Sequence, residues 1–312
     1  MFFILSIKNK QTILSMKTIR NLIGMKGLAS VVISLFLFLS SCKENSGIDY
    51  SSSDNLNVQS EANSDAMAEE VDDMSAVAVS SDAAPIGGRG IAITDTRFAC
   101  AKTINIEPAL DNNPPSVIHG YITVDFGTGC SGPGGRVRTG IFKIEYVGKR
   151  FMPGSKMIIT FDNYTVNGIK FDGIRTLTNV STSETAPVAY SITEDGMILT
   201  YPDGSTATRS VQKVRTWIRT SNPLQDSWTV AGTAAGTNRK GKSYTMTITK
   251  DLIYSRACGV SNKVFIPVQG TKVLVVDNKS ITIDYGNGDC DSKLTITING
   301  RSRDVDASAD GN

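Results

Sequence analysis

Histidine is almost absent from this sequence of 312 residues, which contains His119 and no other. A Ser-His-Asp or Cys-His triad would have to use that residue, and no G-x-S-x-G nucleophile elbow accompanies it. The chain also lacks Cys-x-x-Cys pairs, which disfavours a zinc site. We therefore expect no catalytic function, and we expect His119 to lie at the edge of a strand.

Blocks of basic residues are missing as well. The net charge is +2, and no segment predicts a basic helix that could enter a nucleic-acid groove. After residue 42, no apolar run is long enough to cross a bilayer. The sequence thus predicts neither a nucleic-acid partner nor a membrane-spanning segment.

The N-terminal region predicts a leader instead. Residues 25–42, "MKGLASVVISLFLFLSSC", combine Lys26 with an apolar run and small residues before Cys42. This pattern is typical of a secretory signal, and "LSSC" resembles a bacterial lipobox. The resemblance implies a signal peptide over 1–41, cleavage before Cys42 and a membrane anchor of lipid, including palmitate, on Cys42. The next residues, "KEN", resemble the surface-export signal of Bacteroidota lipoproteins, so we expect an outer-membrane or cell-surface location.

Residues 42–92 form an acidic segment after the lipidated cysteine. Ten acids face only two bases there, and Tyr50 is its one aromatic residue. Such a composition buries too little apolar surface to offset the entropy of ordering, so we predict a disordered tether. An alternative is that the acids recruit a cation or a basic partner.

The sequence pattern changes from about residue 93, where apolar residues recur with a period of two. The segments "YTMTIT" (244–249), "SITIDYG" (280–286) and "KLTITING" (293–300) are examples. Alternation of this kind marks strands with one buried face. Asn-Gly and Asp-Gly pairs between the runs suit hairpin turns. We therefore predict that residues 93–312 form an all-β domain of antiparallel hairpins, arranged as a sandwich or as a curved, half-open barrel.

"DFGTGCSG" (125–132) contains G-x-G-x-x-G, the pattern of a dinucleotide-binding loop. That loop needs a helix after its glycines, whereas the following residues read as another strand. A later segment, "ITIDYGNGDC" (281–290), repeats "ITVDFGTGC" (122–130), and "RFAC" and "SRAC" precede the two copies. The repetition predicts two similar cysteine-containing modules in which the glycines form turns.

The four cysteines after Cys42 are expected to pair, because an even number in an exported protein indicates disulfides. Three pairings are conceivable. The repeat favours Cys100–Cys130 and Cys258–Cys290, since each bond then closes the same kind of loop. Each would stabilise the fold by about 3–4 kcal/mol in the chain-entropy model.

Several of these features together resemble a family of β-rich lipoproteins of Bacteroidota whose activity is uncharacterised. They are the lipobox, the acidic segment, the hairpins in "GSKMIITFDNYTVNGIKFDG" and the two repeated strands. The resemblance would cover most of residues 93–305. It implies location and architecture and supplies no catalytic residues. Curved-sheet lipid carriers of the envelope are a looser comparison, on architecture alone.

One strand offers candidate binding residues. In "RSVQKVRTWIRT" (209–220), one face presents Lys213, Arg215, Trp217 and Arg219. An exposed tryptophan among cations could stack on a sugar ring or hold an anionic headgroup. The interpretation that we favour is a solvated face on which arginine stems cover the indole.

Two sets of acidic residues are candidates for a metal site and for catalysis. A Gly-rich turn gathers possible Ca²⁺ ligands, namely Asp284, Asn287, Asp289 and Asp291, although Asp and Asn favour turns without any metal. A carboxylate-based hydrolase could use residues such as Asp125, Glu145 and Asp162. We expect a non-catalytic binding or structural role at the outer membrane or cell surface, for which the ligand could be a glycan or another envelope component. The alternatives are a carrier of an amphiphile and, last, that hydrolase. No oligomeric state is predicted.

Overall fold

The computed structural model describes residues 51–82, 96–108, 119–132, 135–149, 151–262 and 264–307. The predicted leader, Cys42 and both ends of the predicted tether lie outside these ranges. All the described residues fall within one compact unit. Among them, no helix has both the length and the apolar composition that a membrane span requires.

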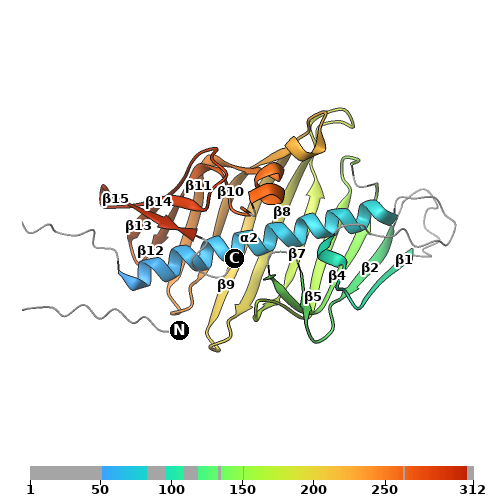
Figure 1. Cartoon of the computed structure of the whole chain (residues 1–312), viewed down its shortest axis with the longest axis horizontal. Coiled ribbons are helices and arrows are strands. Elements are labelled where there is room, and N and C mark those ends of the chain that lie inside the picture. The colour runs from blue at the N-terminus through green and yellow to red at the C-terminus, as the bar shows by residue number, and fades with distance from the viewer. Residues whose placement is uncertain are drawn as a thin grey trace, which may run out of the picture. The chain divides into compact units, whose positions relative to one another are not determined.

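The described chain forms one antiparallel sheet with a long helix, α2, across one face (Figure 1). The helix runs from Ser52 to Asp82. The strands are β1 Thr103–Pro108, β2 His119–Asp125, β3 Cys130–Ser131, β4 Val137–Val147, β5 Lys156–Val166, β6 Ile169–Asp172, β7 Ile174–Asn179, β8 Ala189–Thr200, β9 Thr206–Ile218, β10 Ser227–Thr237, β11 Ser243–Ser255, β12 Gln269–Val276, β13 Lys279–Asn287, β14 Lys293–Ile298 and β15 Arg301–Asp306. Three short helical turns, η1 Thr96–Phe98, η3 Pro223–Gln225 and η4 Cys258–Asn262, lie between strands.

The strands follow one another through the sheet nearly in chain order, with β1 at one edge and β15 at the other. The prediction of an all-β antiparallel meander is confirmed. The sheet is single and curves around α2, since no side chain from residue 57 to residue 79 is exposed. Of the two predicted arrangements, it matches the half-open barrel. We call the face against α2 the inner face and the opposite one the outer face.

Alternating residues produce these strands as expected. In β14, Leu294, Ile296 and Ile298 are buried on the inner face, whereas the threonines between them are half-buried. The turn pairs Asn167-Gly168 and Asn299-Gly300 both have positive φ at their two positions, 49° and 79° and then 51° and 74°. This geometry fits tight hairpins, and Asn and Gly are the residues that adopt it at low cost.

The predicted disorder of residues 42–92 is wrong for α2, and the folded region therefore begins well before residue 93. The helix contains eight acids and no base, and its faces differ little in hydrophobicity. Composition alone assigns such a segment to solvent. In the folded protein, however, cations of the sheet and its loops meet these carboxylates, so the acids are buried as ion pairs.

Local signals start and orient α2. Ser51 Oγ accepts a hydrogen bond from Asp54 N at 3.2 Å, and Ser51 N donates to Asp54 Oδ2 at 2.8 Å. This reciprocal pair is a capping box, which satisfies amides that the first turn leaves free. Further along, a ridge of apolar side chains with helical spacing packs into the core beneath β2–β8, namely Met67, Val71, Met74 and Ala78.

Both predicted disulfides are confirmed. The Cα atoms of Cys100 and Cys130 lie 5.4 Å apart, and those of Cys258 and Cys290 lie 5.1 Å apart. The first bond joins residues that flank β1 and β2, and the second joins residues that flank β12 and β13. The same module therefore occurs toward each end of the sheet.

The repeated glycines form turns in both modules. Asp125 Oδ1 accepts a hydrogen bond from Gly127 N at 2.7 Å, and Asp284 Oδ1 accepts one from Gly286 N at 2.9 Å. The first glycine of each pair has a positive φ, 62° at Gly127 and 79° at Gly286. Strands follow both turns, so the context of a dinucleotide-binding loop is missing in the described residues.

Candidate functional site

Asp65 is the centre of the charge network in the N-terminal half of α2. Its carboxylate accepts hydrogen bonds from Lys213 at 2.5 Å and Lys272 at 2.8 Å, and it pairs with Arg209. Burial alone would raise the pKa of Asp65, but these three cations outweigh burial and hold the pKa well below its usual range. Glu61, 3.8 Å from Arg209 and from Lys272, adds a second negative charge. Charge therefore fastens this half of the helix to β9 and β12.

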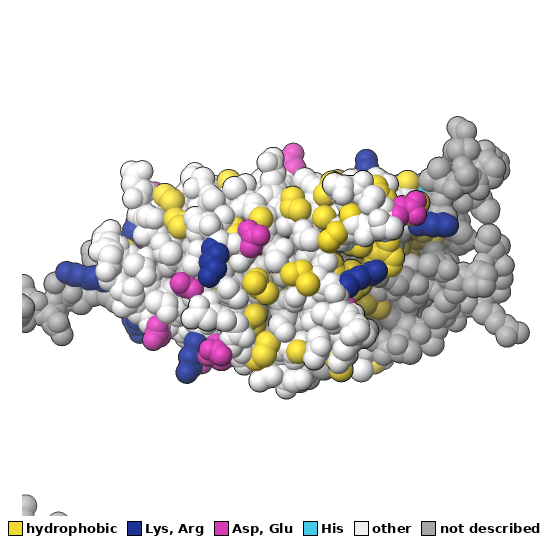
Figure 2. Space-filling model, turned by 90° about the horizontal axis from the view of Figure 1, so that it is seen from above, with side chains coloured by type: hydrophobic (Ala, Val, Ile, Leu, Met, Phe, Trp, Pro, Cys, Tyr) yellow, Lys and Arg dark blue, Asp and Glu magenta, His cyan; other side chains and the backbone are white. Residues whose placement is uncertain are grey.

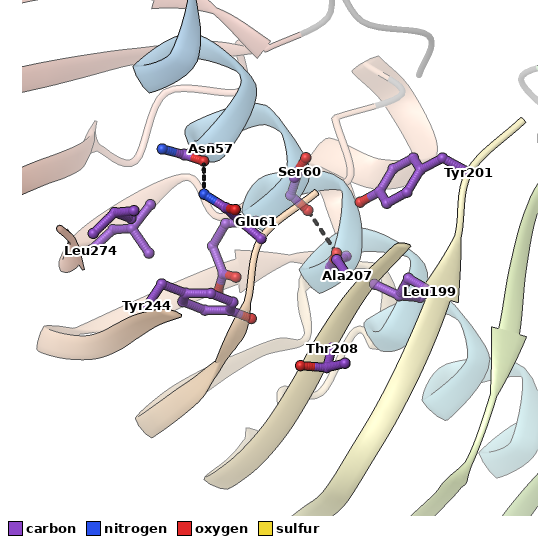
Figure 3. A pocket seen from close by; sticks show the side chains of 12 residues that line it. Asn57, Ser60, Glu61, Leu199, Tyr201, Ala207, Thr208, Tyr244 and Leu274 are labelled. Atoms are coloured by element: carbon purple, nitrogen blue, oxygen red, sulfur yellow. Dashed lines mark hydrogen bonds between the residues drawn. The ribbon is translucent and has the colours of Figure 1, made fainter. Parts of the chain in front are cut away.

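Little space remains between the N-terminal half of α2 and the sheet. Figure 3 shows Asn57, Ser60 and Glu61 of the helix facing Tyr244 and Leu274 of the sheet. The cavity among them measures about 20 Å³, which is room for about one water molecule. Asn238 Nδ2 closes this region by donating to Asn57 Oδ1 at 2.9 Å.

Ion pairs also fasten the C-terminal half of α2. Arg175 donates to Asp72 through two bonds of 2.6 Å, which is a bidentate pair, and it also reaches Glu194 of β8. Glu70 pairs with Arg136 and Arg138. Asp73 accepts a bond of 2.7 Å from Arg97 of η1. These contacts bind the helix to β4, β7 and η1.

The C-terminal half of α2 nevertheless leaves a cavity of about 410 Å³ toward β10, β11 and residues 256–266. We call it the aromatic cavity. One helix face, with residues spaced by three or four positions, forms one wall, namely Ala66, Glu69, Glu70, Asp73 and Val77. Apolar and aromatic side chains form much of the rest, namely Trp228, Tyr254, Val264, Phe265 and Ile266. Its volume lies within the range of small-molecule pockets, about 300–1,000 Å³.

Trp228 has no free ring face in this wall. Tyr254, its cross-strand partner on β11, stacks on it with an interplanar angle of 5° and a centroid distance of 5.8 Å. The Arg215 guanidinium lies 4.4 Å from the indole centroid. Because β9 and β11 flank β10 on opposite sides, Arg215 and Tyr254 cover opposite faces. The indole Nε1 is buried and has no hydrogen-bond partner among the described residues.

Arg256 is the second unsatisfied donor in the wall. Arg97 and Arg136, the other cations that line the cavity, pair with Asp73 and Glu70. Glu69 lies 3.3 Å from Arg215. Within the described part of the chain, the Arg256 guanidinium makes no hydrogen bond or ion pair. Arg256 and Trp228 also line a smaller adjoining cavity of about 40 Å³, so both lie where the two cavities meet.

The two disulfide modules hold the loops that enclose the aromatic cavity. Thr96 and Arg97 line it just before Cys100, and Arg256 and Gly259 line it beside Cys258. Cys100–Cys130 lies where β1 and β4 begin, and Cys258–Cys290 lies at the opposite strand ends. Exposed apolar side chains share the strand ends of Cys258–Cys290, namely Phe151, Val180, Ile218, Leu224 and Phe265. Figure 2, seen from above, shows hydrophobic side chains gathered over the centre and right of this end.

The candidate binding strand has a different role from the predicted one. Lys213, Arg215 and Trp217 do lie on the inner face of β9, but Lys213 and Arg215 pair with Asp65 and Glu69 of α2. Trp217 is half-buried and donates to Asp226 Oδ2 at 3.1 Å.

The ring of Trp217 is covered as well. The Arg219 guanidinium lies 4.3 Å from the ring centroid, and the Phe151 ring lies 5.9 Å away. The favoured interpretation, an indole covered by an arginine, matches the structure. The candidate stacking surface on Trp217 is not open.

The predicted calcium turn is explained by its own backbone. Asp284 accepts from Gly286 N, and Asp291 Oδ1 accepts from Lys293 N at 3.2 Å, while Asn287 and Asp289 are exposed. Among the described residues, no group of three or more His, Cys, Asp or Glu side chains is placed to hold a metal ion. Asp and Asn commonly make such bonds in turns.

The candidate catalytic acids lie away from the cavity. Asp125, Glu145 and Asp162 alternate with buried positions of β2, β4 and β5, which places them on the outer face. His119 is the first residue of β2, and its Nε2 lies 3.0 Å from Glu145 Oε1. These groups therefore do not converge on the aromatic cavity.

Sequence reasoning missed the aromatic cavity, although one signal for it was present. The repeated modules each place an arginine shortly before the first cysteine, Arg97 in "RFAC" and Arg256 in "SRAC". Both arginines line the cavity. Comparison with models of protein families, with curated proteins and with solved structures found no match to this chain.

Proposed function

We propose that the protein is a non-catalytic binding protein of the cell envelope, anchored at the outer membrane by lipid on Cys42, and that it holds a small amphiphile in the aromatic cavity. The cavity of about 410 Å³ carries this proposal. Its walls are mainly apolar, and a few polar groups converge on one side. That combination is the usual character of a ligand pocket.

The covered tryptophans favour an amphiphile over the expected glycan. Sugar rings commonly pack against a free aromatic face. Arg215 and Tyr254 occupy the faces of Trp228, and Arg219 and Phe151 pack on Trp217. An alkyl chain needs only apolar walls, which Val264, Phe265 and Ile266 supply.

Exposed apolar side chains beside the cavity also suit a ligand that comes from a lipid phase. Phe265 lines the cavity and is itself 39% exposed. Phe151, Val180 and Leu224 lie exposed at the same end of the sheet. An apolar rim of this kind would shield an alkyl chain from water as it enters.

Fluorescence of Trp228 tests the binding proposal, because a ligand that enters the cavity changes the polarity around the indole. The full chain with Trp217→Phe leaves Trp228 as the one tryptophan. It is exported with its own leader, reconstituted into phospholipid nanodiscs and titrated with 11-bromo-1-undecanol and 11-bromoundecanoic acid. We expect a saturable change in the Trp228 emission with at least one probe after correction for partition into empty nanodiscs. If neither probe changes the emission saturably, the proposed function is wrong.

A separate experiment tests the anchor. The sequence "LSSC" supports lipid attachment at Cys42. We expect the Cys42→Ala chain to leave the membrane fraction and to lose mass corresponding to acyl chains. The Cys42 chain should remain in the outer-membrane fraction after a high-salt wash. An unmodified Cys42 in mass spectrometry would overturn this part of the proposal.

A further inference from the structure

The aromatic cavity contains two polar donors that the protein itself does not use. Trp228 Nε1 is buried without a hydrogen-bond partner, and the Arg256 guanidinium makes no polar contact with any described residue. A buried donor without a partner, such as Trp228 Nε1, destabilises the protein until an acceptor meets it. Both groups donate, so together they are suited to an acceptor and not to a donor or a cation.

The charges around the cavity lead to the same conclusion. Asp73 is committed to Arg97, Glu70 to Arg136 and Arg138, and Glu69 to Arg215. None of these carboxylates contacts Arg256 directly. Glu69 Oε2 is buried without a hydrogen bond, but it lies 3.3 Å from Arg215, so its nearest cation is Arg215 and not Arg256. Burial tends to raise the pKa of Asp73, but several nearby cations, Arg256 among them, lower it. The carboxylate of Asp73 nevertheless bonds to Arg97 and not to Arg256.

The two disulfide modules provide an internal comparison. Each places an arginine shortly before its first cysteine, and both arginines line the cavity. Arg97 meets an acid of α2 at 2.7 Å, whereas Arg256 meets none. The helix thus supplies a partner for one of these arginines and leaves the other open to the cavity.

We propose that the aromatic cavity selects amphiphiles with an anionic headgroup, and that Arg256 and Trp228 Nε1 bind this headgroup where the two cavities meet. The inference rests on the proposed function and specifies its ligand. Carboxylates and phosphate monoesters share the required chemistry, since both offer several acceptor oxygens to an arginine. The alkyl chain then lies along Val264, Phe265 and Ile266.

The test compares four probes with the same chain and different headgroups. They are 11-bromo-1-undecanol, 11-bromoundecanoic acid, 11-bromoundecyl phosphate and (11-bromoundecyl)trimethylammonium. In the Trp217→Phe chain on nanodiscs, we expect an anionic probe to bind at least about tenfold tighter than the alcohol. We expect the cationic probe to bind more weakly than the alcohol. The tighter of the two anions identifies the headgroup.

Variants assign the preference to one residue. Arg256→Gln should remove the preference for the anion and leave binding of the alcohol within about twofold. Arg256→Lys should retain part of it, because the charge remains. Arg219→Gln is the matched control, since Arg219 stacks on Trp217 and does not line the cavity. It should leave all four affinities unchanged.

The failures of the two proposals are distinguishable. Equal binding of the alcohol and the anions would overturn the headgroup inference and leave the amphiphile proposal standing. A preference that survives Arg256→Gln would also overturn it, provided that circular dichroism and thermal melting show a folded variant. If Arg256→Gln does not fold, Arg256→Lys decides, because its anion affinity must then fall relative to that for the alcohol.

Discussion

The two halves of α2 meet the sheet with the same chemistry and opposite results. In the N-terminal half, Asp65 draws three cations together and leaves a cavity of about 20 Å³. In the C-terminal half, ion pairs hold the helix to β4, β7 and η1, yet a cavity of about 410 Å³ remains, and the paired side chains of Glu70, Asp73, Arg97 and Arg136 line it. Buried ion pairs can therefore either fill an interface or form part of a cavity wall.

The largest effect that we predict comes from breaking the closed half. Asp65→Asn removes the charge that Arg209, Lys213 and Lys272 share, and only the more distant Glu61 and Glu194 remain to offset them, each 3.8 Å from the nearest of these cations. Removing one partner of a buried ion pair typically costs about 3–5 kcal/mol. We expect a loss of this size in the free energy of unfolding, measured by urea titration.

Asp54→Asn is the matched control for Asp65→Asn. Asp54 pairs with Lys279 at 2.5 Å, but the Lys279 side chain is 28% exposed. The amide oxygen of the variant can still accept the bond from Ser51 N, so the loss is mainly that of one partly exposed pair and should cost about 1 kcal/mol, well below that of Asp65→Asn. If the two variants unfold alike, α2 does not dock through Asp65 in solution.

The disulfides offer the next largest effect, and one that separates the two halves. Each closes a loop of 30 or 32 residues, for which the chain-entropy model gives about 3–4 kcal/mol. Both hold loops of the aromatic cavity, whereas the lining of the small cavity belongs to α2, the strands and residues 201 and 238. We expect Cys258→Ser/Cys290→Ser to weaken binding of 11-bromo-1-undecanol.

Hydrogen exchange provides the control for the disulfide variant. Amides of α2 near Asn57 and Glu61 should keep their protection relative to global stability, because the part of the disulfide loop that they meet is strand β12, which β11 and β13 hold in place without the bond. Unchanged probe binding in the variant would show that the bond does not shape the cavity.

The sheet could be predicted from the sequence because each strand shows its own alternation of apolar and polar residues. A residue such as Ile296 is apolar, its neighbours are threonines, and burial follows the alternation. The cysteine pairing could also be predicted, because the repeat relates Cys100–Cys130 to Cys258–Cys290. Both inferences need only one strand or one module.

The helix and the cavity could not be predicted in the same way. Burial of Asp65 depends on Lys272, which is 207 residues away in the chain, and no local pattern contains that information. Two local signals for α2 were nevertheless present, the capping residues Ser51 and Asp54 and the ridge from Met67 to Ala78. The cavity joins α2 with β10, β11 and residues 256–266, so only the tertiary fold reveals it.

The two halves of α2 also differ in the direction in which they shift the pKa of a buried carboxyl group, lowered for Asp65 and raised for Glu69. Burial raises the pKa of Glu69, since Arg215 offsets burial only in part and Asp72 adds negative charge. The contribution of Glu69 to stability therefore falls as the pH rises through this raised pKa. Asp65 has a lowered pKa and contributes stability that is present above about pH 4 and lost as the pH falls through its folded-state value.

Variants with an amide in place of each carboxyl group test these opposite dependences of stability on pH. Relative to the unmodified chain, Glu69→Gln should become more stable as the pH rises from about 4 to 7. The unmodified chain loses stability over this range because Glu69 resists ionisation in the folded state, and the glutamine of the variant does not titrate. Asp65→Asn should show its full loss throughout that interval and a smaller loss near pH 2. Urea unfolding at the three pH values provides the data. If the two variants change with pH in the same direction, their carboxylates are not in the opposed environments described above.

The smallest effect concerns the start of the closed half. Ser51 Oγ accepts from Asp54 N, so Ser51→Ala leaves that amide without its cap. Loss of such a cap typically costs about 1 kcal/mol. Ser52→Ala is the matched control, since Ser52 is exposed and its side chain makes no hydrogen bond with a described residue.

If the cap variant is less stable while probe binding at the aromatic cavity is unchanged, the two halves of α2 are energetically separate. A simultaneous loss of binding would instead show that the helix docks as one unit, because a change at its first turn would then reach the cavity through the whole length of α2.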